Sequence, residues 1–460
     1  MEIDVNPRRD FFIHLLKGIN SLVITTTCNL NCCFCSRKFN PFTQKSYHRD
    51  FDEIVEEIKM FIPNFMKTIN SSISRMTDGE PFSHPRFWDI LKLIREIYPY
   101  RGRLRLGDKI QITTNGTYLT EENLKKLDDL KGIIIVHSIN STDIEDWIKL
   151  SGSTRKLAEI ATTVPKLIKN FDIEYVASVV AMPEVVGYDG IERTIRDLDK
   201  NDVKSIRVFL PTYTKYTSKE NQGMLFCDEN RLKDLIDRLR EELKITIWLY
   251  PTIYDDITPK MHGFESFGIN QSDEILHINN KRIFSRDHAN EILLSGMDIH
   301  RVTIKTRNEE VKQIDVNPLK IEIKNYLNFI INQDVTFTPE IIEEKVRGCK
   351  KILVACSEAG EKIVKKAFEK AIDWSDELKK KEFYFQTVHN DFYEGTVKCA
   401  GLLVCRDYEK YIKEFIDKNF KPDIVLMSHN SFDLSGRDLL NEPIYDVCSK
   451  LGIKFELVSS

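Results

Sequence analysis

Residues 28–35 read Cys28-Asn29-Leu30-Asn31-Cys32-Cys33-Phe34-Cys35, and they follow an apolar run at residues 21–27 that predicts a β-strand. Three thiols at the spacing C-x3-C-x2-C can hold three irons of a four-iron, four-sulfur (4Fe-4S) cube. The fourth iron is then open to a substrate or cofactor, whereas a cube that only carries electrons usually takes four thiolates. A structural zinc site also prefers four ligands, and the chain has no second C-x2-C pair. The spacing therefore favours an open iron–sulfur cube over zinc.

Polar motifs follow three further predicted strands. Asp78-Gly79-Glu80-Pro81 follows residues 72–77, Thr114-Asn115-Gly116 follows residues 109–113, and His137-Ser138-Ile139-Asn140-Ser141 follows residues 132–136. Parallel α/β folds place their chemistry at the carboxyl ends of the strands. We therefore expect these motifs to lie at one edge of a sheet. A structural, hydrogen-bonded role for His137 is favoured over proton donation.

The cysteine spacing, the aromatic Phe34 before the last cysteine and the Gly-Glu-Pro turn resemble the radical S-adenosylmethionine (radical SAM) enzymes. That family's turn reads Gly-Gly-Glu-Pro, and Asp78 replaces its first glycine here. The resemblance implies that Cys28, Cys32 and Cys35 bind the cube, that S-adenosylmethionine (SAM) chelates the fourth iron, and that Cys33 is a packed thiol. It also implies a set of SAM-binding residues: Phe34, Gly79, Glu80, Pro81, Thr114, Asn115, Ser138 and Asn140.

The resemblance further implies oxidoreductase chemistry carried by the cofactors. One electron, from a donor such as a flavodoxin or ferredoxin, would cleave SAM to a 5′-deoxyadenosyl radical that abstracts hydrogen from a substrate. A small metabolite is favoured as the substrate, and a peptide or protein remains an alternative. A non-catalytic iron–sulfur or zinc scaffold is the competing class.

Strand and helix patterns alternate through the first half of the chain. Strands are predicted over residues 21–27, 72–77, 109–113, 132–136, 174–182 and 205–210, with amphipathic helices between them. Such alternation implies parallel pairing with right-handed crossovers. The predicted fold is α/β, with an open (β/α)6 partial TIM barrel at residues 1–244.

Two smaller modules are predicted after the barrel. Residues 268–283, a helix at 285–294 and a strand at 300–306 resemble the middle of a PDZ domain, which gives a PDZ-like, β-rich domain at 245–318. A structural clamp is favoured over a peptide reader, because the loop that binds a peptide carboxylate is not found. Residues 390–403 and 423–427 resemble the C-terminal domain of unknown function in bacterial PDZ/radical SAM proteins, which gives a smaller α/β domain at 319–460.

Four cysteines of this last segment raise the question of an auxiliary cluster. They lack a dense C-x2-C pair, and buried free cysteines commonly act as small hydrophobes. We expect an apolar strand between the third and the fourth of them. The four are Cys349, Cys356, Cys399 and Cys405.

Composition narrows the remaining classes. The 460 residues carry a net charge of −4 and are 42% hydrophobic, and no basic stripe suggests a nucleic-acid partner. No apolar run approaches the ~20 residues that a membrane span needs. The amino terminus is charged rather than signal-like, and ten cysteines without a signal indicate a reducing compartment. We therefore expect a cytoplasmic protein without a membrane or nucleic-acid partner.

Overall fold

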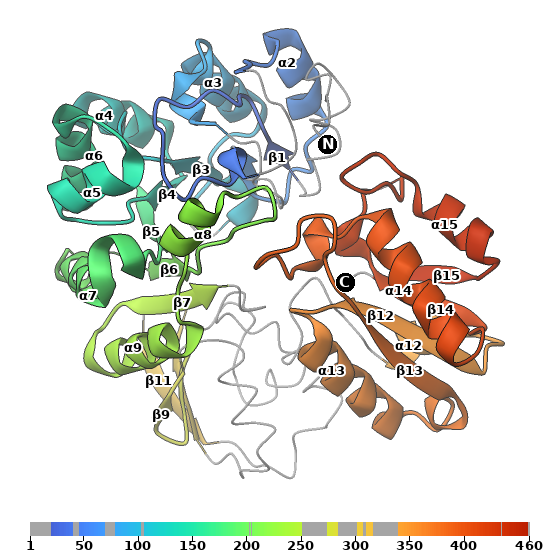
Figure 1. The fold of residues 1–460 in the computed structure, drawn as a ribbon. Helices are drawn as coiled ribbons and strands as arrows, with labels where there is room; N and C mark the ends of the chain where they lie inside the picture. Colours follow the sequence, from blue (N-terminus) through green and yellow to red (C-terminus); the bar gives the residue numbers. More distant parts are fainter. Residues whose placement is uncertain are drawn as a thin grey trace. The chain divides into compact units, whose positions relative to one another are not determined.

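The computed structural model describes residues 20–39, 46–69, 79–102, 105–201, 203, 205–250, 274–283, 301–306, 310–315, 339–433 and 435–458. The chain divides into two compact units (Figure 1). The first comprises Met1–Tyr250 and Tyr393–Val397, and the second comprises Pro251–Phe392 and Lys398–Ser460.

The first unit is built on an all-parallel sheet whose strands follow one another in sequence order. The predicted parallel α/β arrangement is confirmed, and the sheet has seven strands where six were expected. The predicted strand at 72–77 lies outside the described residues, and the second strand of the sheet lies just before it. The strands are β1 (Ser21–Leu22), β2 (Lys67–Ile69), β3 (Ile110–Thr114), β4 (Ile133–Ser138), β5 (Glu174–Val180), β6 (Ser205–Phe209) and β7 (Thr246–Tyr250).

Helices connect these strands, and side-chain caps fix where several of them begin. Asp50, Thr120, Asp143 and Asp228 each accept a hydrogen bond from a backbone N–H of the first helical turn. The helices are α2 (Phe51–Lys59), α3 (Phe87–Ile97), α4 (Glu121–Leu130), α5 (Ile144–Ser151), α6 (Arg155–Leu167), α7 (Pro183–Lys200), α8 (Lys219–Met224) and α9 (Glu229–Glu242), with short 3-10 turns η1 (Ser36–Lys38), η2 (Pro81–Ser83), η3 (Leu106–Asp108) and η4 (Ile168–Asn170).

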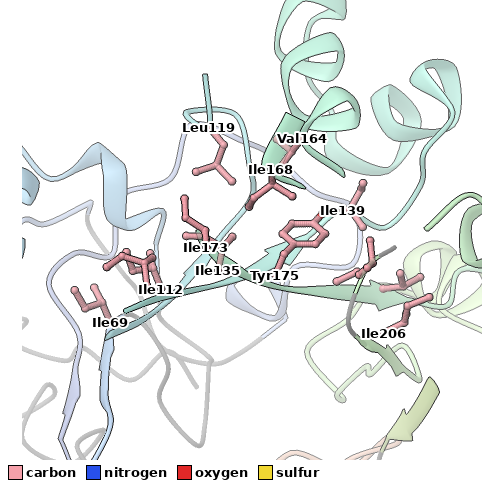
Figure 2. Close-up of a cluster of buried hydrophobic side chains, with 14 of the residues drawn as sticks. Ile69, Ile112, Leu119, Ile135, Ile139, Val164, Ile168, Ile173, Tyr175 and Ile206 are labelled. Atoms are coloured by element: carbon pink, nitrogen blue, oxygen red, sulfur yellow. The ribbon is translucent and has the colours of Figure 1, made fainter. Parts of the chain in front are cut away.

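The main core lies between one face of this sheet and the helices. Alternate strand residues point to opposite faces, so every second side chain of β3–β7 enters this layer. Figure 2 shows strand side chains packed against residues of α6 and η4. The residues labelled there are Ile69, Ile112, Leu119, Ile135, Ile139, Val164, Ile168, Ile173, Tyr175 and Ile206.

A buried lysine organises the amino edge of the same sheet. Lys67 Nζ donates to the carbonyls of Pro63, Phe65 and Gly107 at 2.9, 3.0 and 2.6 Å, which satisfies all three of its protons. A cavity of about 390 Å³ lies beside these loops, lined in part by Tyr98. This cavity is at the edge opposite to the strand-end motifs, because Lys67 begins β2 and η3 precedes β3.

The second unit contains two four-stranded sheets. The antiparallel sheet has the order β11-β10-β8-β9, and the parallel sheet has the order β13-β12-β14-β15, with β12 pairing on both sides. The expected PDZ-like helix at 285–294 lies outside the described residues. The strands are β8 (Glu274–Ile278), β9 (Lys281–Arg282), β10 (Arg301–Lys305), β11 (Val311–Asp315), β12 (Lys351–Ser357), β13 (Glu382–Val388), β14 (Ile424–Ser428) and β15 (Phe455–Val458).

Helices and 3-10 turns complete the parallel part of the second unit. They are α12 (Pro339–Lys345), α13 (Glu361–Trp374), α14 (Cys405–Lys418), α15 (Ile444–Leu451), η7 (Leu378–Lys380), η8 (Ala400–Leu402) and η9 (His429–Ser431). The prediction of a strand between Cys399 and Cys405 is wrong. The 3-10 turn η8 occupies this stretch, and α14 begins at Cys405. Its apolar residues Leu402 and Leu403 are buried without joining a sheet ladder. Across the described part of the chain, no helix is long and apolar enough to cross a lipid bilayer.

We predict that the main core between the first sheet and its helices contributes much of the stability of the first unit. Ile112 is fully buried, so Ile112→Ala is expected to lower the free energy of unfolding by about 2–5 kcal/mol, through lost burial and a cavity. The matched control is Ile62→Ala at a side chain that is 46% exposed, with an expected effect within about 0.5 kcal/mol. Urea unfolding measures both, and equal effects would contradict this location of the core.

Candidate functional site

The cysteine loop leaves the end of the β1 segment and is tied to the end of α5. The backbone N–H of Asn31 donates to Ser151 O at 3.0 Å, and that of Cys33 donates to Leu150 O at 2.9 Å. Within the loop, Cys35 N donates to Cys32 O at 3.3 Å, which tightens the turn between these two cysteines. The loop is therefore held by backbone contacts at several points.

The thiols of this loop are half-buried and interact electrostatically. Burial raises the pKa of Cys28, Cys32 and Cys33, and electrostatic interaction with Cys35 adds to the rise at Cys28 and Cys32. Among the described residues, no three His, Cys, Asp or Glu side chains converge closely enough to hold a single metal ion. A four-iron cube needs no such convergence, because each thiolate bonds to an iron at a different corner.

Cys33 lies apart from this arrangement in its packing. It and Phe34 pack against a buried cluster that includes Leu150, Met182 and Leu225. This environment agrees with the interpretation of Cys33 as a small packed hydrophobe. Phe34 packs against the same cluster.

The Gly79-Glu80 turn pairs with the strand segment that leads into the cysteine loop. Gly79 N donates to Thr25 O at 2.9 Å, and Glu80 N donates to Thr27 O at 2.8 Å. A Cβ at Gly79 would lie 2.1 Å from Thr27 O, so no other residue fits this close backbone approach. Pro81 follows as the first residue of η2. Asp78 lies outside the described residues.

The carboxylate of Glu80 joins this turn to the end of β3. Its two oxygens accept hydrogen bonds from Thr114 Oγ1 at 2.7 Å, Asn115 N at 2.8 Å and Phe82 N at 3.3 Å. Burial raises the pKa of Glu80 to about 7, although these three donors favour the charged form. The side chain is therefore held between its own turn and the end of β3.

Asn115 connects β3 to the cysteine loop. Its Nδ2 lies 3.8 Å from Cys28 Sγ and 2.9 Å from Asn29 Oδ1, which are hydrogen-bond distances to sulfur and oxygen respectively. Its Oδ1 accepts from Thr117 N and Oγ1 at 3.1 and 2.7 Å. The side chain therefore spans from its own turn to the first cysteine of the motif.

His137 and Tyr175 form a buried pair next to Asn115, and sequence analysis did not predict this pair. His137 Nε2 lies 3.3 Å from Asn115 O, and His137 Nδ1 lies 2.8 Å from the hydroxyl of Tyr175. Burial lowers the pKa of His137 to about 3, so its ring is neutral at physiological pH. The favoured structural interpretation of His137 agrees with this placement in the helix-facing layer. Nothing in the sequence pairs it with Tyr175, which lies on the next strand.

Ser138 and Asn140 lie at the end of the neighbouring strand β4. Asn140 adopts a φ of +55°, which asparagine tolerates better than most residues, and its Nδ2 donates to Ser138 Oγ at 3.1 Å. Its Oδ1 accepts from Val180 N at 2.8 Å, which joins the ends of β4 and β5. Both residues thus lie at the carboxyl end of β4, and within the described ranges no hydrogen bond links them to the cysteine loop.

A row of side chains crosses the opposite face of the sheet and was also missed. Ile206 and Val208 enter the helix-facing core, so Arg207 between them points to the other face. The register aligns Ser138 with Ser178, Ser178 with Arg207, and Arg207 with Trp248. Arg207 is half-buried and forms no ion pair within the described ranges. A charged residue inside an otherwise apolar strand is the signal that could have identified it.

The structure therefore brings some of the predicted site residues into direct contact and leaves others nearby. Cys28, Gly79, Glu80, Thr114 and Asn115 belong to one hydrogen-bonded network at the carboxyl ends of β1 and β3. Of the four later cysteines, Cys356 and Cys405 are buried, Cys349 is half-buried and Cys399 is exposed.

We predict that Glu80 gives the fold a specific pH dependence. Its pKa is raised from 4.5 to about 7 in the folded protein, so the folded state holds this proton more tightly than the unfolded state does. The stability that this proton contributes to the fold is therefore present at low pH and is lost as pH rises through 7. The free energy of unfolding is expected to fall by about 2–3 kcal/mol between pH 5 and pH 8 relative to Glu80→Gln. Urea unfolding across this range measures it, with the exposed Glu56→Gln as control. Parallel pH profiles for wild type and Glu80→Gln would contradict the raised pKa.

The sequence of this chain is also similar to those of known proteins. Residues 22–215 match the sequence profile of the Radical SAM superfamily. The tungsten-containing aldehyde ferredoxin oxidoreductase cofactor-modifying protein of Pyrococcus furiosus is 31% identical over 119 residues, which are 25% of this chain and 28% of that protein. The match thus spans less than a third of this relative's length.

Solved structures overlap with about half of the chain. Streptococcus suis SuiB bound to S-adenosylmethionine is 16% identical, with a TM-score of 0.38 over 52% of each chain. Native anSMEcpe with bound AdoMet is 17% identical, with a TM-score of 0.36 over 49% of this chain and 63% of that chain. The sequence match identifies residues 22–215 as a radical SAM superfamily domain, the domain of enzymes that use a 4Fe-4S cluster and SAM.

Proposed function

We propose that the chain is a radical SAM enzyme in which Cys28, Cys32 and Cys35 hold a 4Fe-4S cube. The observation that carries the proposal is the contact network joining Cys28, Glu80 and Asn115 at one edge of the parallel sheet. A thiol triad alone suits several metals, but here the family's Gly-Glu-Pro turn lies against the backbone that leads into the triad. When bound, the cube and SAM would supply a 5′-deoxyadenosyl radical for hydrogen abstraction.

The donor set fits a cube that keeps one iron open. Three thiols of one loop lie close enough to perturb one another, while Cys33 is packed among apolar side chains. The raised thiol pKa values mean that the ligands lose protons when metal binds. Because backbone contacts hold the loop to α5 and to its own turn, little ordering is left for the metal to impose.

We propose that SAM lies along the carboxyl ends of β2–β4. The backbone of Gly79-Glu80-Pro81 and the turn at Thr114-Asn115 line one part of this edge, and Ser138 and Asn140 line the next. Asn140 donates to Ser138 Oγ at the end of β4 and accepts from Val180 N at the end of β5, so its side chain can present a fixed geometry to a ribose. Phe34 would contribute an apolar wall from the cysteine loop.

We further propose that the substrate is a small metabolite with an anionic group. Arg207 supports this proposal, because a half-buried guanidinium with no ion pair among the described residues suits a carboxylate or phosphate. Arg207 lies in one row with Ser138 on the face of the sheet that points away from the helices. The proposed SAM site and the substrate contact would therefore adjoin on that face. A peptide recognised with help of the predicted PDZ-like domain is the alternative.

We also propose an electron donor, a cellular location and a role for the second unit. An electron donor such as a flavodoxin or ferredoxin would reduce the cube, and the protein would act in the cytoplasm. We propose that the antiparallel sheet β8–β11 belongs to a PDZ-like module and that the parallel sheet β12–β15 is the core of a C-terminal α/β domain. Covering domains of this kind can exclude water and stray hydrogen donors from a radical.

The cube and its ligands are tested by anaerobic reconstitution. We expect about four irons and four sulfides per chain in the wild type, and slow release of 5′-deoxyadenosine with dithionite and SAM. Cys28→Ala, Cys32→Ala and Cys35→Ala are expected to lose both, because each leaves an iron without a ligand. Cys33→Ala is the matched control and keeps both. About one zinc per chain without iron would instead support a non-catalytic scaffold.

The substrate class is tested with a cell extract as the source of unknown ligands. We expect the ultrafiltrate, rather than the retained protein fraction, to stimulate release of 5′-deoxyadenosine, and anion-exchange resin to remove the stimulating compound. Arg207→Gln is expected to reduce this stimulation about tenfold or more, since hydrogen bonds to charged groups are worth about 1.5–3 kcal/mol. The control is Arg231→Gln at an exposed position on α9. Stimulation by the retained fraction alone would favour a peptide or protein substrate.

A further inference from the structure

We propose that the side-chain amide of Asn115 sets the reduction potential of the cluster by donating a hydrogen bond to the sulfur of Cys28. This inference rests on the proposed function, because it needs a cluster on Cys28. It assigns to Asn115 an action on the cluster ligand, beyond the SAM contact that the sequence resemblance implies for this position.

The orientation of the amide follows from its other contacts. Asn115 Oδ1 accepts from both Thr117 N and Thr117 Oγ1, at 3.1 and 2.7 Å, so the oxygen end of the amide is occupied by donors. The nitrogen end must then face Cys28 Sγ and Asn29 Oδ1, at 3.8 and 2.9 Å. An amide has two N–H groups, and these two acceptors match them one to one.

The backbone of Asn115 is fixed from both sides, which limits movement of the amide. Its N–H donates to Glu80 Oε2 at 2.8 Å, and its carbonyl lies 3.3 Å from His137 Nε2. His137 is neutral, so a proton on Nε2 leaves Nδ1 to accept from the hydroxyl of Tyr175 at 2.8 Å. One tautomer therefore satisfies both contacts, and His137 and Tyr175 act as positioning residues for the turn.

The expected direction of the effect follows from charge. One-electron reduction adds negative charge to the cluster and its thiolates, so a donor at Cys28 stabilises the reduced state more than the oxidised state. Hydrogen bonds to the sulfurs are among the factors that set cluster potentials. Without this donor the cluster is harder to reduce, and its potential is lower.

The experiment compares the reconstituted full-length wild type with Asn115→Ala and Asn115→Asp in an EPR-monitored redox titration. Loss of the donor is expected to make one-electron reduction about tenfold less favourable, which is a fall of ~59 mV for a one-electron couple. Asn115→Asp keeps the side-chain shape but replaces the donor with negative charge, so we expect a fall at least as large. The control is Asn123→Ala, whose amide donates to Tyr118 O at 2.9 Å on the same β3–α4 segment and does not contact Cys28.

The outcomes separate this inference from the proposed function. A wild-type protein that assembles no iron–sulfur cluster would refute the proposed function itself. Clusters that form in all variants with the same potential would overturn only the role of Asn115. If neither Asn115 variant assembled the cluster while Asn123→Ala did, Asn115 would be needed for assembly, and the assignment to the potential would be overturned.

Discussion

The buried carboxylate of Glu80 is the interaction on which the arrangement of this site depends. A buried carboxylate without partners carries a desolvation cost of several kcal/mol, so its three donors must stay in place. Two of the donors come from Thr114 and Asn115 at the end of β3, and the third comes from Phe82 in its own turn. The carboxylate therefore fixes the β3 end against the Gly79-Glu80 turn. Gly79 in turn allows that turn to approach the backbone before the cysteine loop, where a Cβ would collide with Thr27 O.

The two faces of the first sheet carry different kinds of side chain. The helix-facing side is a continuous apolar layer that includes Ile112, Ile135 and Ile206, and it makes the sheet a rigid support. The other face carries the row of Ser178, Arg207 and Trp248, which offers polar and aromatic contacts close to the strand ends. Functional groups placed on loops above a rigid sheet keep their geometry while the loops remain free to vary.

The thiols of the cysteine loop are held in a neutral state by their surroundings. Burial raises the pKa of Cys28 and Cys32, so the thiols are neutral and the loop avoids repulsion between thiolates. In the proposed site, binding of iron would reverse this balance, because bound thiolates share their charge with the metal. The amide of Asn115 is already directed at Cys28, so a hydrogen bond to the ligand needs no rearrangement.

Local sequence determined the elements of this protein, and tertiary structure decided which of their residues meet. The apolar runs of β3–β6 and the capped helices were predictable, since propensity and periodicity act within short segments. The cysteine spacing and the Gly79-Glu80-Pro81 turn could likewise be located from residue order. The seventh strand at residues 246–250 and the missing strand between Cys399 and Cys405 could not, because pairing with a neighbour decides whether an apolar segment joins a ladder. The contacts of Glu80 with Thr114, Asn115 with Cys28 and His137 with Tyr175 join residues that lie 34 to 87 positions apart. Strand order and register set such pairs, and both are properties of the folded sheet.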